Sequence, residues 1–254
     1  METSKFSYAC FRVLRKAIDI VYPKITVVGE ENLPQEACIL VGNHSHAHGP
    51  ICGELRFPGK RKIWCAHQML YMKEVPDYTF QDFWGLKPKW THWFYRGLSY
   101  LIAPLSVCLF RNASVIPVYR DNRLLTTFRQ TISALEAEEN IIIFPECYEP
   151  YNNIVYTFQD RYIDVAKLYY KRTGKRLPFV PLYIVPALKQ MHIGKPIFFD
   201  PEAPIEQERE RISHYLMEEI TRIAADLPQH TVVPYPNISK KYYPQNRPVE
   251  VKRK

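Results

Sequence analysis

The sequence predicts an α/β fold in which a central, mostly parallel (mixed) β-sheet is flanked by helices. Short runs rich in β-branched and aromatic residues alternate with helical segments along the chain. Residues 141–144 are apolar at every position, which is typical of a strand that is buried on both faces of a sheet. A chain of 254 residues is long enough to bury such a core within one domain.

The strands and the first helix follow from local patterns. An N-terminal helix is expected before Pro23, because its apolar residues recur at steps of three and four while its basic residues lie largely elsewhere on the helix surface. This basic amphipathic helix suits packing on a core and docking on a membrane equally well. The apolar residues are Phe6, Cys10, Leu14, Ile18 and Val21. Strands are predicted at residues 25–28, 37–41, 63–66, 114–118, 141–144 and 179–185.

Three more helices are predicted, at residues 125–135 after a cap at Asp121, at 160–173 before Gly174, and at 212–227. The chain then divides into an amphipathic helix (1–23), an α/β domain (24–227) and a basic tail rich in proline and tyrosine (228–254). The tail lacks helical periodicity, so we expect it to wrap the surface or to be partly disordered.

Composition places the protein inside the cell. The six cysteines form no C-x-x-C pair, which is typical of free thiols in a reducing cytoplasm. The N-terminal segment has no uninterrupted apolar core before a cleavage site, so no secretory signal is predicted. The most apolar stretch, residues 98–110, is interrupted by Pro104 and is shorter than the roughly 20 residues that cross a bilayer. No transmembrane span is predicted.

A net charge of +8 calls for an anionic partner, either nucleic acid or acidic lipid. Aromatic residues are dense between residues 64 and 100, where lysines and arginines lie among them. This mixture favours a membrane interface, although packed aromatics in a surface loop would look the same. No pattern of an RNA-binding or zinc-finger domain accompanies it. We therefore expect an anionic membrane surface as a partner and no nucleic acid.

Reactive side chains follow three of the predicted strands. His44 comes after the strand at 37–41, Arg120 after the strand at 114–118, and Glu146 after the strand at 141–144. In open α/β sheets ligands bind at the carboxyl ends of the strands. The sequence therefore predicts that an imidazole, a guanidinium and a carboxylate meet at one edge of the sheet.

These segments resemble, in the same chain order, the conserved blocks of the lysophosphatidic acid and glycerolphosphate acyltransferase superfamily (PlsC-like proteins). The resemblance extends from about residue 25 to about residue 227 and implies a glycerolphosphate-acyltransferase-like fold. Residues 193–196 also resemble a segment that recurs in that family. The blocks correspond to Asn43-His44 (the start of Asn-His-x-x-x-x-Asp), residues 116–120, Phe144-Pro145-Glu146 and Val180-Pro181.

The resemblance implies an O-acyltransferase of phospholipid synthesis, peripheral on the cytoplasmic face of the membrane. It would move an acyl chain from acyl carrier protein or coenzyme A to the hydroxyl of a lysophospholipid-type acceptor, with no cofactor beyond the thioester donor. His44 would be the general base, a task for which histidine is suited because its pKa lies near 7. By the same resemblance, the acceptor would be bound by Arg120, Phe144, Pro145 and Glu146.

The chain departs from the family pattern at the aspartate of the first block, where Gly49 stands. In a serine-protease triad, disabling the corresponding aspartate costs roughly 10⁴ in turnover. A catalytically weakened or inactive lipid-binding pseudoenzyme of the same fold is therefore the alternative. Cys147, Tyr148 and Glu149 in the third block, with Tyr119 before Arg120, also favour an acceptor other than lysophosphatidic acid. Substitute partners for His44 are His46, His48, Glu54, Asp77 and Asp82.

Some of these residues have other interpretations. His44, His46 and His48 alternate, so in an extended segment they would share one face as metal ligands do. No metal site is predicted, because no carboxylate or fourth histidine lies nearby in the sequence. Glu146 can instead cap a following turn, and Arg120 can pair on the surface near Asp121.

Overall fold

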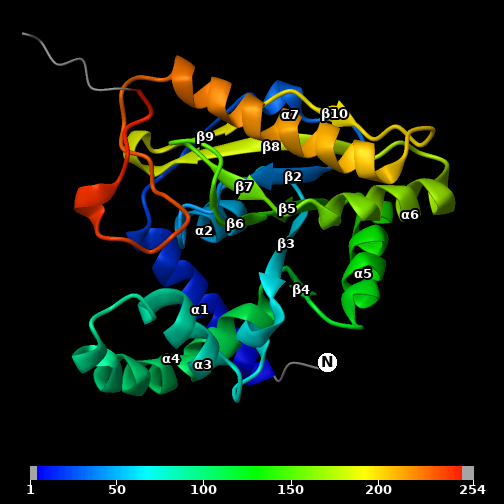
Figure 1. Ribbon diagram of the computed structural model, residues 1–254. Coiled ribbons are helices and arrows are strands. Elements are labelled where there is room, and N and C mark those ends of the chain that lie inside the picture. The colour runs from blue at the N-terminus through cyan, green and yellow to red at the C-terminus, as the bar shows by residue number, and fades with distance from the viewer. Residues whose placement is uncertain (1–4, 248–254) are drawn as a thin grey trace, which may run out of the picture. The chain divides into compact units, whose positions relative to one another are not determined.

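The computed structural model describes residues 5–247 and divides the chain into two compact units (Figure 1). The first unit consists of Met1–Pro23 and Lys62–Gln130, and the second of Lys24–Arg61 and Thr131–Lys254. The predicted division at residues 23 and 227 stays a prediction. Each unit is described separately below.

The second unit contains most of the central sheet. Its strands lie side by side in the order β1 (Thr26–Val28), β9 (Gln190–Ile193), β8 (Pro178–Val185), β2 (Ile39–Gly42) and β5 (Asn140–Ile143). Strand β2 is parallel to both β5 and β8, and β1 is parallel to β9. Strand β8 is antiparallel to β9 and to the short β10 (Ile197–Phe198). The predicted α/β class, with a mixed and mostly parallel sheet, is confirmed.

The central strands form because their residues are apolar on both faces. Every residue of β2 and of the eight-residue strand β8 is buried, as is every residue of β5 after Asn140. Ile39 pairs with Ile141 on one side and with Phe179 on the other. Such runs can be stable only in the interior of a sheet that is covered on both faces.

The second unit's helices are α2 (His48–Leu55), α6 (Asp164–Thr173) and α7 (Ile205–Asp226). Helix α7 buries Ile212, Leu216 and Ile220 along one stripe and lies against β8 (Figure 1). Gly174 ends α6 in the left-handed conformation that the sequence predicts. Single 3₁₀ turns lie at η1 (Glu30–Asn32), η5 (Arg161–Ile163), η6 (Pro186–Leu188) and η7 (Lys240–Tyr242). A separate hairpin consists of β6 (Glu146–Pro150) and β7 (Tyr156–Phe158).

The first unit pairs β3 (Arg61–Ala66) with β4 (Val115–Val118) in parallel. Helix α1 (Lys5–Val21) packs along α4 (His92–Asn112), where Ser7 bonds to Asn112 of α4. Helix α5 (Leu124–Glu136) lies across the sequence boundary between the units. The segment between β3 and α4 contains η2 (His67–Leu70), α3 (Val75–Thr79), the π-helix η3 (Phe80–Trp84) and η4 (Lys89–Thr91).

Helices α1 and α4 leave much of their apolar surface exposed. Phe11 is the one buried residue of α1, whereas Phe6 and Val21 are 80% and 84% exposed. The apolar stretch at 98–110 lies within the longer helix α4. Pro104 removes one backbone hydrogen bond of this helix but does not end it. The predicted interruption is therefore wrong. The helical segment Lys89–Asn112 contains an 18-residue stretch with a mean hydropathy of 1.2 and is, by length and composition only, long and apolar enough to cross a bilayer.

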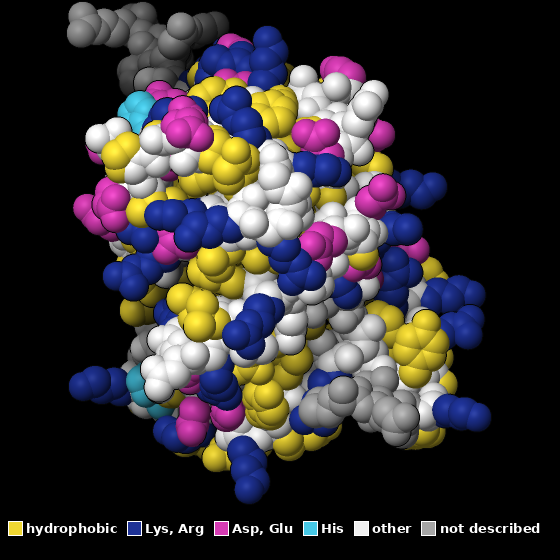
Figure 2. Space-filling model, turned by 90° about the vertical axis from the view of Figure 1, so that its right-hand side faces the viewer, with side chains coloured by type: hydrophobic (Ala, Val, Ile, Leu, Met, Phe, Trp, Pro, Cys, Tyr) yellow, Lys and Arg dark blue, Asp and Glu magenta, His cyan; other side chains and the backbone are white. Residues whose placement is uncertain are grey.

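Basic side chains are spread over the face shown in Figure 2, with acidic and apolar side chains among them. The net charge of +8 is therefore not gathered into one stripe on that face.

Candidate active site

His44 lies just beyond the carboxyl end of β2. Val41 near that end pairs with Ile143 of the parallel neighbour β5, and β5 is followed at once by Phe144-Pro145-Glu146. Parallel strands end at the same edge of a sheet, which is why the two predicted blocks come together there. The structure brings the backbone of His44 and the carboxyl group of Glu146 together at this edge, whereas the predicted meeting of the imidazole, the guanidinium and the carboxylate stays a prediction.

The carboxyl group of Glu146 joins two distant segments. Its Oε2 accepts the backbone N–H of His44 at 2.5 Å, and its Oε1 accepts the backbone N–H of Tyr156 at 3.0 Å. The side chain is almost completely buried, with 3% of its surface exposed. Burial raises the pKa of Glu146 to about 7, although the two N–H donors oppose this shift. Glu146 therefore fixes the backbone at position 44 rather than capping the turn that follows it.

Asn43 fixes the same loop from the other side. Its Nδ2 donates to the backbone carbonyl of Ile184 at 3.0 Å and to Ser45 Oγ at 2.7 Å. Its Oδ1 accepts the N–H of Ile184 at 2.8 Å. This amide is buried, so each of these bonds also satisfies a polar group that water does not reach. From the sequence, Asn43 was expected only as part of the Asn43-His44 motif, and its contact with β8 was not predicted.

The backbone after His44 turns sharply. Ser45 and His46 both have positive φ, at 46° and 54°, a conformation that costs non-glycine residues roughly 1–2 kcal/mol each. His48 then begins α2. The segment is therefore not extended, and the alternating face on which a metal site would depend does not form. Within residues 5–247 there is no group of three metal-binding side chains.

The turn leaves no room for a side chain at Gly49. The N–H of this glycine donates to the carbonyl of His44 at 3.0 Å. A Cβ at this position would lie 2.4 Å from that same carbonyl oxygen and 3.0 Å from the ring of Phe144. Contacts as short as 2.4 Å do not occur in folded proteins, so the turn in its present form excludes an aspartate.

The imidazole of His44 lies among aromatic rings. Its centroid is 5.5 Å from that of Phe144 and 6.0 Å from that of Tyr235, both in edge-on geometry. Within residues 24–61 and 131–247, no side chain forms a hydrogen bond to this ring. Burial lowers the pKa of His44 to about 4, as does the charge of His46, while a bond with the His46 backbone opposes the shift. The ring is therefore neutral at physiological pH.

Of the predicted partners of His44, His46 uses Nε2 to bond the carbonyl of Pro236 at 3.2 Å. The pKa of the His48 imidazole is lowered by burial and by the charges of His46 and Lys240. Asp82 belongs to the first unit, so its pairing with His44 stays a prediction.

Arg120 also belongs to the first unit, so its meeting with His44 stays a prediction too. Its side chain is exposed, and within residues 5–247 it forms no ion pair. The expected surface contact near Asp121 is made by Arg123 instead, at 2.7 Å.

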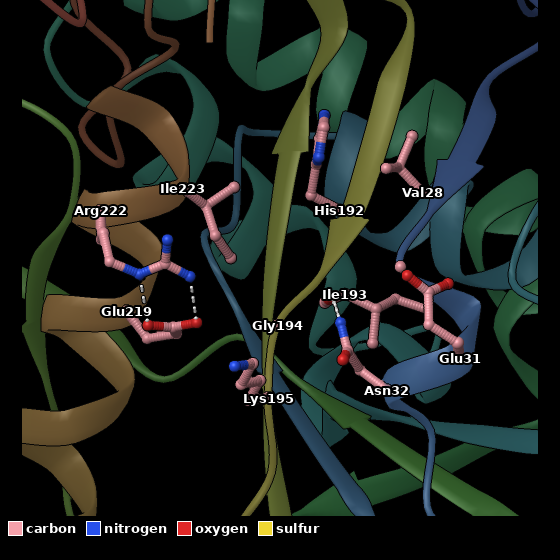
Figure 3. Close-up of a pocket in the computed structure, with 11 residues that line it drawn as sticks. Val28, Glu31, Asn32, His192, Ile193, Gly194, Lys195, Glu219, Arg222 and Ile223 are labelled. Atoms are coloured by element: carbon pink, nitrogen blue, oxygen red, sulfur yellow. Dashed lines mark hydrogen bonds and ion pairs between the residues drawn. The ribbon is translucent and has the colours of Figure 1, made fainter. Parts of the chain in front are cut away.

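The second unit also contains an open hollow of about 220 Å³, shown in Figure 3. It includes Gly194 and Lys195 of the predicted recurrent segment, and the ion pair between Glu219 and Arg222 of α7 lies on its wall. A Cβ at Gly194 would lie 2.6 Å from Pro181. Close packing of the chain against β8 therefore explains the glycine of this segment.

The pKa shifts of His44 and Glu146 predict opposite effects of pH on stability. His44, lowered from 6.5 to about 4, stabilises the fold fully above pH 6.5, and this contribution is lost as the pH falls toward 4. Glu146, raised from 4.5 to about 7, stabilises the fold fully below pH 4.5, and this contribution is lost as the pH rises toward 7.

Other histidines with lowered pKa values, such as His48, titrate in the same interval, so each variant is compared with the wild type. Between pH 4.5 and 6.5, the free energy of unfolding should rise more steeply with pH in Glu146→Gln than in the wild type. In His44→Gln it should rise less steeply than in the wild type, or fall. Each change of slope is limited to about 1.4 kcal/mol per pH unit. Urea denaturation at several pH values measures the slopes, and changes of the same sign in the two variants would contradict the shifts.

Comparison with known proteins gives one kind of match. No family model matches the chain, and no curated protein matches it. Among solved structures, the chain is similar to the 1-acyl-sn-glycerophosphate (LPA) acyltransferase PlsC from Thermotoga maritima. The identity is 16%, with 87% of this chain and 81% of that chain covered, and the TM-score is 0.46.

Proposed function

We propose that the protein is an O-acyltransferase that uses His44 as its general base. It would move an acyl chain from an acyl carrier protein or coenzyme A thioester to the hydroxyl of a lysoglycerophospholipid-type acceptor. The observation that carries the proposal is the bond between the Glu146 carboxyl group and the amide of His44. Two motif residues 102 positions apart in the chain are thereby joined at the edge of the sheet where α/β enzymes bind ligands.

The chemistry needs a base that is unprotonated at neutral pH. A neutral His44 can accept the proton of the acceptor hydroxyl while the hydroxyl oxygen attacks the thioester carbonyl. The new C–O bond forms, the C–S bond breaks, and the proton passes from the imidazole to the departing thiolate. Because no carboxylate raises the pKa of the ring, this base is weaker than one with a pKa near 7.

The acceptor's anionic group would pair with Arg120. Arginine presents a planar fork that bonds two phosphate oxygens at once, and this guanidinium is exposed. On the His44 side, Phe144 would pack against the acceptor. Glu146 would act through the backbone that it holds rather than by touching the acceptor.

The alternative is a lipid-binding pseudoenzyme of the same fold. It is favoured by the turn at Gly49, which excludes the family's aspartate, and by the lack of a side-chain partner for the His44 ring within residues 24–61 and 131–247. An acyl-transfer assay separates the two. Purified protein is supplied with radiolabelled acyl-coenzyme A or acyl carrier protein and with a panel of lysolipids. Acylated lipid supports the enzyme, and binding to lipid without product supports the pseudoenzyme.

Attachment to the anionic, cytoplasmic face of the membrane is part of the proposal. Large apolar side chains are exposed along the outer side of α4 and just before it, which is unusual for a surface that meets only water. Lys87, Lys89 and Arg96 lie among them and suit anionic headgroups. The exposed residues are Leu86 (72%), Trp90 (78%), Trp93 (78%), Phe94 (54%), Tyr100 (59%) and Leu101 (75%).

Replacing Trp90, Trp93 and Phe94 together with serine should release the protein from vesicles that contain anionic lipid, because the interfacial rings are lost. Cosedimentation measures the bound fraction. Leu125→Ser is the matched control, since Leu125 is 58% exposed and lies on α5. Undiminished binding of the triple variant would exclude this segment as the membrane contact. Deleting residues 1–22 tests the contribution of α1 in the same assay.

A further inference from the structure

The C-terminal segment folds into a closed loop, residues 230–246, which we call the C-terminal loop. The N–H of His230 donates to Asn246 Oδ1 at 2.8 Å, and the N–H of Val232 donates to the carbonyl of Pro244 at 2.9 Å. Thr231 and Gln245 form an antiparallel bridge between the two arms. Over residues 230–246, the tail that was expected to wrap the surface or to be partly disordered therefore has a defined structure.

The base of the C-terminal loop is held by buried polar groups. Asn246 donates through Nδ2 to the carbonyl of Ala224, near the end of α7, at 2.8 Å. The ring of His230 lies 2.7 Å from the hydroxyl of Tyr183 on β8. Asn246 and His230 are 6% and 4% exposed, so these bonds are shielded from water. The loop is thus fixed to the same strand that holds Asn43.

The tip of the C-terminal loop, Pro234-Tyr235-Pro236, lies against the turn that carries His44. The Tyr235 ring is 6.0 Å from that of His44, 5.1 Å from that of Tyr148 and 6.2 Å from that of Tyr156. The carbonyl of Pro236 bonds His46. Proline fixes its own φ and restricts the residue before it, so the backbone of Tyr235 has little freedom. The two prolines therefore restrict the directions in which the Tyr235 ring can point.

A wall of rings beside the base has a chemical consequence. Water can use the same base as a lipid hydroxyl does: it attacks the thioester carbonyl and gives its proton to the imidazole, which returns it to the departing thiolate. The products are then a free fatty acid and a free thiol. An acyltransferase must suppress this hydrolysis by keeping water away from the reacting groups.

We propose that the tip of the C-terminal loop is part of the acyl-transfer site, and that Tyr235 is a positioning residue that excludes water from His44. The inference rests on the acyltransferase function proposed above. Tyr235 then decides how much of the thioester is transferred to lipid and how much is lost to hydrolysis. His44 is half-buried, and the Tyr235 ring lies edge-on to it at 6.0 Å, between the imidazole and the rings of Tyr148 and Tyr156 that it also contacts. The lowered pKa of His44 is in keeping with this partial shielding.

The test compares Tyr235→Ala and Tyr235→Phe with the wild-type protein, and uses Tyr242→Ala as a control. Tyr242 is 65% exposed, and its ring contacts Lys241. With acyl-coenzyme A and a lysolipid, the ratio of free fatty acid to acylated lipid should rise several-fold in Tyr235→Ala. Tyr235→Phe keeps the ring, so its ratio should be close to that of the wild type. Tyr242→Ala should leave it unchanged, and an unchanged ratio in Tyr235→Ala would overturn the proposal.

A second readout needs no activity. In protein labelled at histidine, NMR titration should show the pKa of His44 near 4 in the wild type and in Tyr235→Phe. In Tyr235→Ala it should move toward 6.5, because water reaches the ring. An unmoved pKa would overturn the proposal even if no acyl transfer is found. If the pKa moves but the wild type forms no acylated lipid, the shielding stands and the acyltransferase function fails.

Discussion

His44→Ala is expected to abolish acyl transfer while the protein stays folded. Loss of a general base usually costs about 10² to 10⁴ in rate. The fold should persist because Glu146 and Gly49 bond the backbone of residue 44, not its ring. The measurement is the turnover of labelled thioester into acylated lipid, with circular dichroism to confirm the folded state.

The matched control is His214→Ala. This histidine lies on the exposed side of α7 and contacts the ring of Tyr151. Its removal should leave turnover at the wild-type level. Wild-type turnover in His44→Ala would exclude the imidazole as the base. Loss of turnover in both variants would point to damaged folding.

Gly49→Ala is expected to destabilise the protein and to stop acyl transfer. The new Cβ would overlap the carbonyl oxygen of His44. Because the backbone must shift to relieve this overlap, we expect the free energy of unfolding to fall by about 1–3 kcal/mol. The same movement would displace the base. For the same reason Gly49→Asp should not raise activity. Thermal unfolding and the acyl-transfer assay measure the two effects.

Gly97→Ala makes the same chemical change where there is room for it. Nothing lies within 4 Å of a Cβ at Gly97, which is an exposed residue of α4. Alanine is favoured over glycine inside a helix, so this variant should be stabilised by about 0.5–1 kcal/mol. A Gly49→Ala protein that unfolds at the wild-type temperature and keeps its activity would show that the turn tolerates a side chain.

The sequence predicted three central strands because their residues are apolar on both faces, but it did not predict β7, β9 or β10. Residues 39–42, 141–143 and 179–185 are apolar throughout, and all of them form central strands. Strand β6 escaped prediction because it is polar and exposed along most of its length, with the sequence Glu-Cys-Tyr-Glu-Pro. Helix α2 escaped because glycine and proline in its first turn are typical of a loop.

The arrangement of the site could be predicted only where neighbouring parallel strands bring distant residues to the same edge of the sheet. His44 and Glu146 follow neighbouring parallel strands, so topology alone brings them together. The contacts of Asn43 with Ile184 and of Tyr235 with His44 depend on tertiary packing and leave no periodic pattern. In retrospect, the one usable signal for Tyr235 was an aromatic residue held between two prolines.

One carboxyl group holds both the amide of His44 and that of Tyr156, and this links two parts of the site mechanically. Tyr156 belongs to β7, whose partner β6 carries Tyr148. Under the proposed function, a substitution that shifts this hairpin to suit a bulkier acceptor would also pull on the backbone beside the proposed base, His44. Acceptor preference and base alignment are therefore expected to change together in variants of the hairpin, and tuning one without the other would require a new anchor for residue 44.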